Sequence, residues 1–93
     1  MIRSFAGKET ERVWNEERSR KLPPDIQETA LRKLQMLDAA NKIEDLRNPT
    51  GNRLERLKGD RKGQWAIRIN AQWRICFVWS DGHAEDVEIC DYH

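Results

Sequence analysis

The sequence has few cysteines and no long apolar run. Its two cysteines, Cys76 and Cys90, stand outside any Cys-x-x-Cys spacing, so neither a disulfide framework nor a structural zinc site is expected. No apolar run approaches the roughly 20 residues that a bilayer span needs, and the first residues lack the apolar segment of a signal peptide. We therefore expect a cytoplasmic protein with no membrane partner, in which both cysteines are small buried side chains of strands.

The sequence signatures of common cofactor and hydrolase sites are also missing. There is no glycine-rich phosphate loop and no Gly-x-Ser-x-Gly nucleophile turn. Two isolated histidines, His83 and His93, have no partners at metal-ligand spacing. We expect neither a metal nor another cofactor.

The chain does contain enough apolar residues for one small core. Its 93 residues are 38% hydrophobic and 35% charged, and this length leaves no room for a second core. Four tryptophans and several patterned apolar runs argue against disorder. We predict a single domain over residues 1–93.

Two helices are predicted in the N-terminal half. The first covers residues 8–20, where Val13 and Trp14 anchor one side. The second follows Pro23-Pro24-Asp25 and runs to Ala40, because proline suits a first helical turn and an acid suits the positive end of the helix dipole. Its apolar residues recur at helical spacing: Ile26, Ala30, Leu34 and Leu37.

Strands are predicted mainly in the C-terminal half, after the turn residues 48–52. They cover residues 2–5, a short stretch around 54–57, and residues 64–70, 73–79 and 84–90, with Asp81-Gly82 as a hairpin turn. Alternation places three tryptophans on one face, which core packing explains better than a base-stacking platform: Trp65, Trp73 and Trp79. The sequence predicts an α+β fold with two N-terminal helices packed on one face of a small, mostly antiparallel twisted sheet.

The net charge of +1 conceals a basic segment. Residues 53–74 contain seven basic side chains against two acidic ones, whereas residues 75–93 contain five acids and no lysine or arginine. Arg68 and Arg74 alternate away from the aromatic face, so both are expected on the other face of the sheet. This segment is either a solvated surface or a binding surface for a polynucleotide backbone.

The polar residues of this half could together support metal-free cleavage of RNA. That reaction needs a base for the 2′-hydroxyl, cations for the charge that develops on the phosphate, and an acid for the leaving oxygen. Candidates of each type are present: Lys58, Arg68, Arg74, Asp91, Tyr92 and His93. Residue types alone leave a non-catalytic RNA-binding module open as another reading.

Three stretches of the chain carry motifs that are specific in combination. They are residues 52–65 with Leu-Lys-Gly-Asp, residues 67–77 with Trp-Arg-Ile, and the terminal Asp-Tyr-His, supported by residues 1–5 and 31–40. Together these stretches resemble the HigB toxins of bacterial toxin–antitoxin systems. HigB toxins belong to the RelE superfamily, so the resemblance implies a RelE-like fold and cleavage of messenger RNA in the decoding site of the 70S ribosome. It also implies a helix-turn-helix antitoxin, HigA, through which alone the toxin would contact operator DNA.

The resemblance implies a role for each matching residue. Lys58 and Arg74 match positions around the scissile phosphate, and the terminal group consists of Asp91, Tyr92 and His93. Attack by the 2′-hydroxyl would give a 2′,3′-cyclic phosphate, with Asp91 as base or orienting group and His93 as acid. Substrate binding is assigned to three further residues: Arg61, Arg68 and Asn70.

The chain departs from some HigB toxins at Glu55, where those relatives have a histidine. Either Glu55 takes over part of the acid/base work or this position is not essential. We expect the second, because a carboxylate beside a phosphate is costly unless it is protonated or paired. The main alternative function is that of the ParE toxins, which share the fold but poison DNA gyrase. The terminal Asp-Tyr-His favours RNA cleavage over this alternative.

Overall fold

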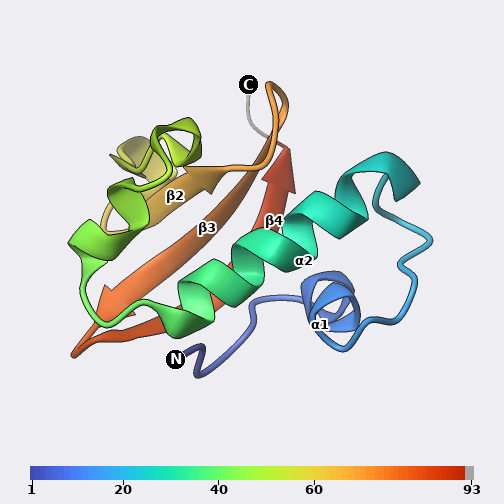
Figure 1. Cartoon of the computed structure of the whole chain (residues 1–93), viewed down its shortest axis with the longest axis horizontal. Coiled ribbons are helices and arrows are strands. Elements are labelled where there is room, and N and C mark those ends of the chain that lie inside the picture. Colours follow the sequence, from blue (N-terminus) through green and yellow to red (C-terminus); the bar gives the residue numbers. More distant parts are fainter. Residues whose placement is uncertain (92–93) are drawn as a thin grey trace.

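The computed structural model describes residues 1–91, and its helices lie on one face of a four-stranded sheet (Figure 1). Tyr92 and His93, with the roles expected for them, lie outside the described residues. The elements are α1 (Lys8–Trp14), α2 (Pro24–Ala39), β1 (Glu55–Arg56), β2 (Trp65–Arg68), β3 (Trp73–Ser80) and β4 (His83–Asp91), with short 3-10 turns η1 (Ile43–Arg47), η2 (Thr50–Asn52) and η3 (Gly59–Arg61). The strands follow one another in the order β1-β2-β3-β4, each antiparallel to its neighbour. The predicted α+β architecture is confirmed.

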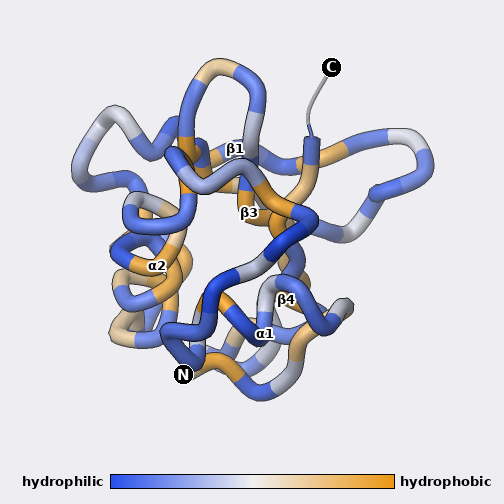
Figure 2. Tube along the Cα trace, turned by 90° about the vertical axis from the view of Figure 1, so that its right-hand side faces the viewer, coloured by the Kyte–Doolittle hydropathy of each residue, from blue (hydrophilic) through white to orange (hydrophobic). Residues whose placement is uncertain are grey.

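Helix α2 is the element that the sequence specifies best. It begins at Pro24, as the proline and acid of its first turn predict, and it buries the four apolar residues that recur at helical spacing. Leu34 and Leu37 are fully buried against the sheet. Figure 2 shows the hydrophobic side of α2 turned toward the strands.

The first helix is shorter than predicted. It ends at Trp14, and Glu16 has a left-handed φ of 60°, so the expected continuation to residue 20 was wrong. The residues after Trp14 have no apolar stripe to bury, and local hydrogen bonds compete for their backbone. Ser19 donates its backbone N–H to Gln27 Oε1 (3.1 Å) and its hydroxyl to Glu9 Oε1 (2.6 Å).

The β3–β4 hairpin forms where the Asp81-Gly82 signal places it. Asp81 and Gly82 both have positive φ, 52° and 79°, as a two-residue type I′ turn requires. A bulge at Asp86, whose φ is also 52°, shifts the register, after which Val87 again faces the core. The strand expected at residues 2–5 was wrong: Ile2 and Phe5 make only isolated parallel bridges to β4.

The main core lies between the helices and the sheet. Its largest fully buried side chains include Phe77, Ile75 and Ile67 from the strands. The three tryptophans of the sheet are partly buried against this core, as the alternation predicted. In the described part of the chain, no helix is long and apolar enough to cross a membrane.

The opposite side of the sheet, which we call the second face, carries a smaller apolar cluster. Leu57, Ala66 and Cys76 are buried there, and Cys90 packs against them. Apart from Leu57 these side chains are small, and neither α1 nor α2 covers this face in Figure 1. The second face is therefore where the chain can present polar groups to a ligand.

Candidate functional site

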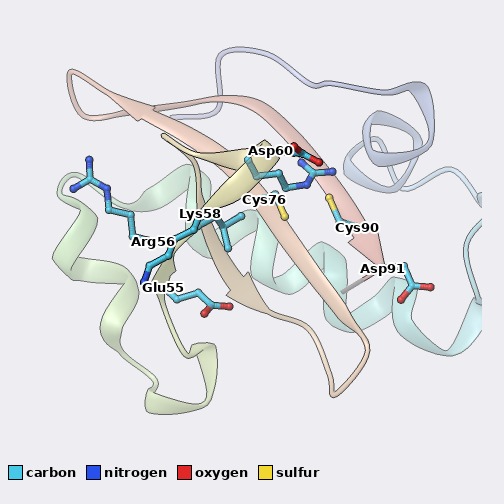
Figure 3. A pocket seen from close by; sticks show the side chains of 9 residues that line it. Glu55, Arg56, Lys58, Asp60, Cys76, Cys90 and Asp91 are labelled. Atoms are coloured by element: carbon cyan, nitrogen blue, oxygen red, sulfur yellow. The ribbon is translucent and has the colours of Figure 1, made fainter. Parts of the chain in front are cut away.

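A cavity of about 480 Å³ opens on the second face, and we call it the site cavity (Figure 3). The two cysteine side chains come from neighbouring strands, Cys76 from β3 and Cys90 from β4. The remaining walls come from β1, the segment after it and the end of β4: Glu55, Arg56, Leu57, Lys58, Asp60, Arg61 and Asp91. Both Lys58 and Asp91, two of the predicted catalytic residues, border this cavity.

Lys58 stands at the beginning of a tight polar segment, residues 58–63. Leu57 before it is buried and donates its N–H to the carbonyl of Gln64 (2.9 Å), which closes the segment at its base. Gly59 and Gly63 have φ values of 66° and 94°, which favour glycine over any other residue. The Lys58 side chain itself is exposed and available to an anion.

Arg74 lies beside the site cavity in a fixed position. Its Nη1 donates to the carbonyl oxygens of Asn70 (2.7 Å) and Trp73 (3.3 Å), and its side chain is only 12% exposed. Asn70 in turn accepts the N–H groups of Gln72 (2.9 Å) and Trp73 (2.8 Å) through Oδ1, which shapes the β2–β3 turn. Asn70 therefore positions Arg74, while its expected contact with substrate stays a prediction.

Two charged neighbours of Arg74 set the electrostatics at this end of the sheet. Arg68 is its register partner on β2, so two cations of the second face lie side by side. Glu55 Oε1 lies 3.9 Å from Arg74 Nε. The carboxylate that replaces the histidine of some relatives is thus paired with a cation, which reduces its repulsion of a phosphate.

Arg61 is held by protein groups, although its side chain is 41% exposed. Its Nη2 lies 3.0 Å from Glu88 Oε1 on β4, and its Nη1 donates to Gln64 Oε1 (3.0 Å). The hydrogen bond to Glu88 raises the pKa of Arg61. These contacts tie the 58–63 segment to β4, and the expected role of Arg61 in substrate binding stays a prediction.

Asp91 closes β4 at the far side of the site cavity from Lys58, as Figure 3 shows. Its Oδ2 accepts a hydrogen bond from Gln72 Nε2 (3.1 Å). Asp91 pairs with Trp73 in register, so it lies at the same end of the sheet as Arg68 and Arg74. The fold therefore gathers Arg68, Arg74 and Asp91 at one end, with Lys58 across the cavity.

The two cysteines line the same cavity as the charged residues, which the sequence did not indicate. Both lie in strands and are free thiols; Cys76 is buried, as expected, whereas Cys90 is only half-buried. A hydrogen bond from Cys90 lowers the pKa of Cys76, and the same bond raises the pKa of Cys90. Strand alternation alone predicts that Cys76 lies on the same face as Arg74. That Cys76 and Cys90 both line the site cavity depends on the register between β3 and β4, which the sequence does not give.

Sequence reasoning missed Glu88, which anchors Arg61. The only signal for it was its position in the acidic last strand, and that signal names no partner. Among residues 1–91, no three histidine, cysteine or carboxylate side chains are grouped so as to hold a metal ion.

Comparisons with known proteins agree with the fold and with the resemblance in the sequence. Residues 3–93 match the family model of the RelE-like toxin of type II toxin–antitoxin system HigB. The chain is 44% identical over 85 residues to Toxin HigB-1 of Vibrio cholerae, covering 90% of each protein. It is 34% identical over 93 residues to Endoribonuclease HigB of Proteus vulgaris, covering 100% of each.

Among solved structures, the chain has the fold of a protein in the YoeB–YefM complex from Staphylococcus aureus. The TM-score is 0.61 at 16% identity, over 100% of this chain and 98% of that one. A second structure, of the heterotetrameric YoeB–YefM toxin–antitoxin complex of the same organism, matches equally well, with a TM-score of 0.61. The chain belongs to the family of RelE-like HigB toxins of type II toxin–antitoxin systems.

Proposed function

We propose that this toxin is a ribosome-dependent endoribonuclease that cleaves messenger RNA without a metal cofactor. The observation that carries this proposal is the fixed guanidinium of Arg74, held by two backbone carbonyls beside a cavity that Lys58 borders. A cation that is already in place stabilises charge developing on a phosphate without further rearrangement. The Proteus vulgaris relative, which matches over the whole chain, is named an endoribonuclease.

In the proposed reaction, the 2′-hydroxyl of the substrate attacks the adjacent phosphorus. The bond from phosphorus to the 5′-oxygen breaks, which leaves a 2′,3′-cyclic phosphate on one fragment and a 5′-hydroxyl on the other. Lys58 and Arg74 stabilise the additional negative charge on the phosphate. Asp91 takes or orients the proton of the 2′-hydroxyl, and His93 protonates the 5′-oxygen, as the HigB resemblance implies. Tyr92 completes this terminal group.

The proposed partners follow from the same family. The 70S ribosome presents the messenger, and a HigA-like helix-turn-helix antitoxin binds the toxin and connects it to operator DNA. We expect the antitoxin to cover the second face or its approaches, because that face would otherwise stay open to ribosomal RNA. We expect the toxin to meet these partners in the cytoplasm.

Expression of the toxin without antitoxin tests this function against gyrase poisoning. We expect growth arrest with messenger fragments that end within translated regions, relieved when the antitoxin is expressed as well. Growth arrest with intact messengers and altered DNA supercoiling would support the ParE-like alternative. Normal growth at high toxin levels would support an RNA-binding module without toxicity.

A further inference from the structure

A second hollow of about 480 Å³ adjoins the site cavity. We call it the 56–63 hollow, because its walls are Arg56, Leu57, Lys58, Gly59, Lys62 and Gly63. It shares Arg56, Leu57 and Lys58 with the site cavity, so the two hollows meet at these residues. A ligand that follows the surface past Lys58 would pass from one hollow into the other.

The walls of the 56–63 hollow carry three cations and no carboxylate. Within residues 1–91, no ion pair joins Arg56, Lys58 or Lys62 to an acid, whereas Arg61 of the same segment is bound to Glu88. Three cations around one hollow repel each other, and an anion placed among them would remove that repulsion. The chemistry of these walls therefore favours an anionic ligand.

The backbone of the hollow leaves room for such a ligand. A Cβ atom added to Gly59 or Gly63 would meet nothing within 4 Å, so the segment is open to solvent at both positions. The guanidinium of Arg56 lies 5.5 Å from the centre of the Trp65 ring, a cation–π distance that holds it in place. Lys62 is exposed and can turn toward a bound group.

We propose that the 56–63 hollow binds a backbone phosphate of the messenger, next along the strand from the phosphate that is cleaved. This inference rests on the proposed function, and it adds Arg56 and Lys62 as the residues that hold this second phosphate. The phosphates of an RNA strand are regularly spaced, so a strand whose scissile phosphate lies at Lys58 carries a neighbouring phosphate past it. Binding there would fix the register of the strand before cleavage.

The first test removes the charge of Lys62. We expect Lys62→Gln to raise the half-saturating concentration of messenger-programmed ribosomes roughly three- to tenfold, and to reduce the salt dependence of binding by about one contact. The matched control is Lys8→Gln, which removes the same charge from an exposed lysine of α1 and should leave the half-saturating concentration unchanged. Equal values for Lys62→Gln and the wild type would overturn the proposal.

The second test identifies the RNA group. Synthetic messengers carry an uncharged methylphosphonate in place of the phosphate next to the scissile one, either on its 5′ side or on its 3′ side. In the wild type, one of the two substitutions should weaken binding about as much as Lys62→Gln does, and in the Lys62→Gln protein the same substitution should cost nothing further. Independent, multiplying losses at both phosphates would place Lys62 against other RNA, such as ribosomal RNA, and would overturn the assignment to the messenger.

The two proposals fail in different ways. A wild-type protein that leaves ribosome-bound messenger intact would overturn the proposed function, and the phosphate subsite with it. A wild-type protein that cleaves, beside a Lys62→Gln variant with unchanged binding and salt dependence, would overturn the subsite alone. Circular dichroism of Lys62→Gln and Lys8→Gln confirms that both variants are folded.

Discussion

At the scale of single residues, the two cations assigned to the phosphate differ in how the fold holds them. Arg74 is fixed by backbone carbonyls of the β2–β3 turn, whereas Lys58 is exposed at the start of the 58–63 segment. An alanine at position 58 removes a charge without disturbing any packed side chain. An alanine at position 74 also removes contacts to the β2–β3 turn, so the stability of the Arg74→Ala protein must be measured as well as its activity.

We predict that Lys58→Ala and Arg74→Ala each lower the rate of messenger cleavage by roughly 10²–10³, the usual cost of removing one preorganised stabilising group. Single-turnover cleavage on programmed ribosomes measures the rate, and urea denaturation of each variant shows whether it is folded. Wild-type growth arrest by a well-expressed Lys58→Ala protein would remove Lys58 from the mechanism.

Asn52 is a fully buried polar residue that joins α2 to the turns after it. It accepts a hydrogen bond from Lys33 Nζ and donates to the carbonyls of Leu46 (3.2 Å) and Asn48 (3.3 Å). Asn52→Ala would leave these groups without their partner, so we predict a loss of about 2–3 kcal/mol in the free energy of unfolding. The exposed Asn15 is the control, and Asn15→Ala should change this free energy by less than about 0.5 kcal/mol. Similar values for the two variants would contradict the account.

Lys33 makes part of the stability depend on pH. Burial, and secondarily the charge of Arg32, lower its pKa below the ordinary value of 10.5. Between the lowered pKa and 10.5 the unfolded chain binds more protons at this residue than the folded one, so the contribution of Lys33 to stability increases as pH rises through this window. In urea denaturation from pH 8 to 10.5, the free energy of unfolding of Lys33→Met should therefore rise less with pH, or fall more, than that of the wild type. Parallel curves for the two proteins would show that Lys33 does not contribute.

At the scale of elements, the 58–63 segment depends on β4 for its position. The Arg61–Glu88 pair joins the two, and Gln64 holds the other side of the Arg61 guanidinium. Glu88→Gln weakens this link without touching Arg61 itself. The pair of variants Glu88→Gln and Arg61→Gln therefore separates positioning of the segment from direct binding of substrate.

We predict that Glu88→Gln slows cleavage roughly three- to tenfold and speeds amide hydrogen exchange over residues 58–63, because Lys58 is then held less firmly. Glu85→Gln, on the same strand but outside this pair, should change neither quantity. If Arg61 only positions the segment, Arg61→Gln will have an effect similar to that of Glu88→Gln. A much larger loss of cleavage for Arg61→Gln, at similar hydrogen exchange, would show that Arg61 also binds substrate.

Elements whose signals are local could be predicted from the sequence. The proline and periodic apolar residues of α2 and the Asp81-Gly82 turn determine their structure within a few neighbouring residues. The end of α1 depends instead on contacts of Ser19 with Glu9 and Gln27, which the sequence does not bring together. The pairing of Glu55 with Arg74 depends in the same way on the order of the strands.

At the scale of the whole molecule, one face of the sheet forms the core and the other face carries the candidate site. The helices and the large apolar side chains cover one face, whereas the second face has only a small apolar cluster and the polar walls of the site. The sequence predicted this division, because Arg68 and Arg74 alternate against the aromatic residues of their strands. The sequence could not predict that Lys58 and Asp91 lie on opposite sides of the site cavity, because this placement depends on how the strands and the 58–63 segment pack.

The central claim is that this toxin cuts messenger RNA on the ribosome by attack of the 2′-hydroxyl. The most direct measurement incubates the purified toxin with a defined messenger, with and without translating ribosomes, and determines the cut positions and the chemistry of both new ends. The account predicts cleavage only when ribosomes are present, with a 2′,3′-cyclic phosphate on one fragment and a 5′-hydroxyl on the other. A messenger that stays intact on ribosomes, or ends that carry a 5′-phosphate, would contradict it.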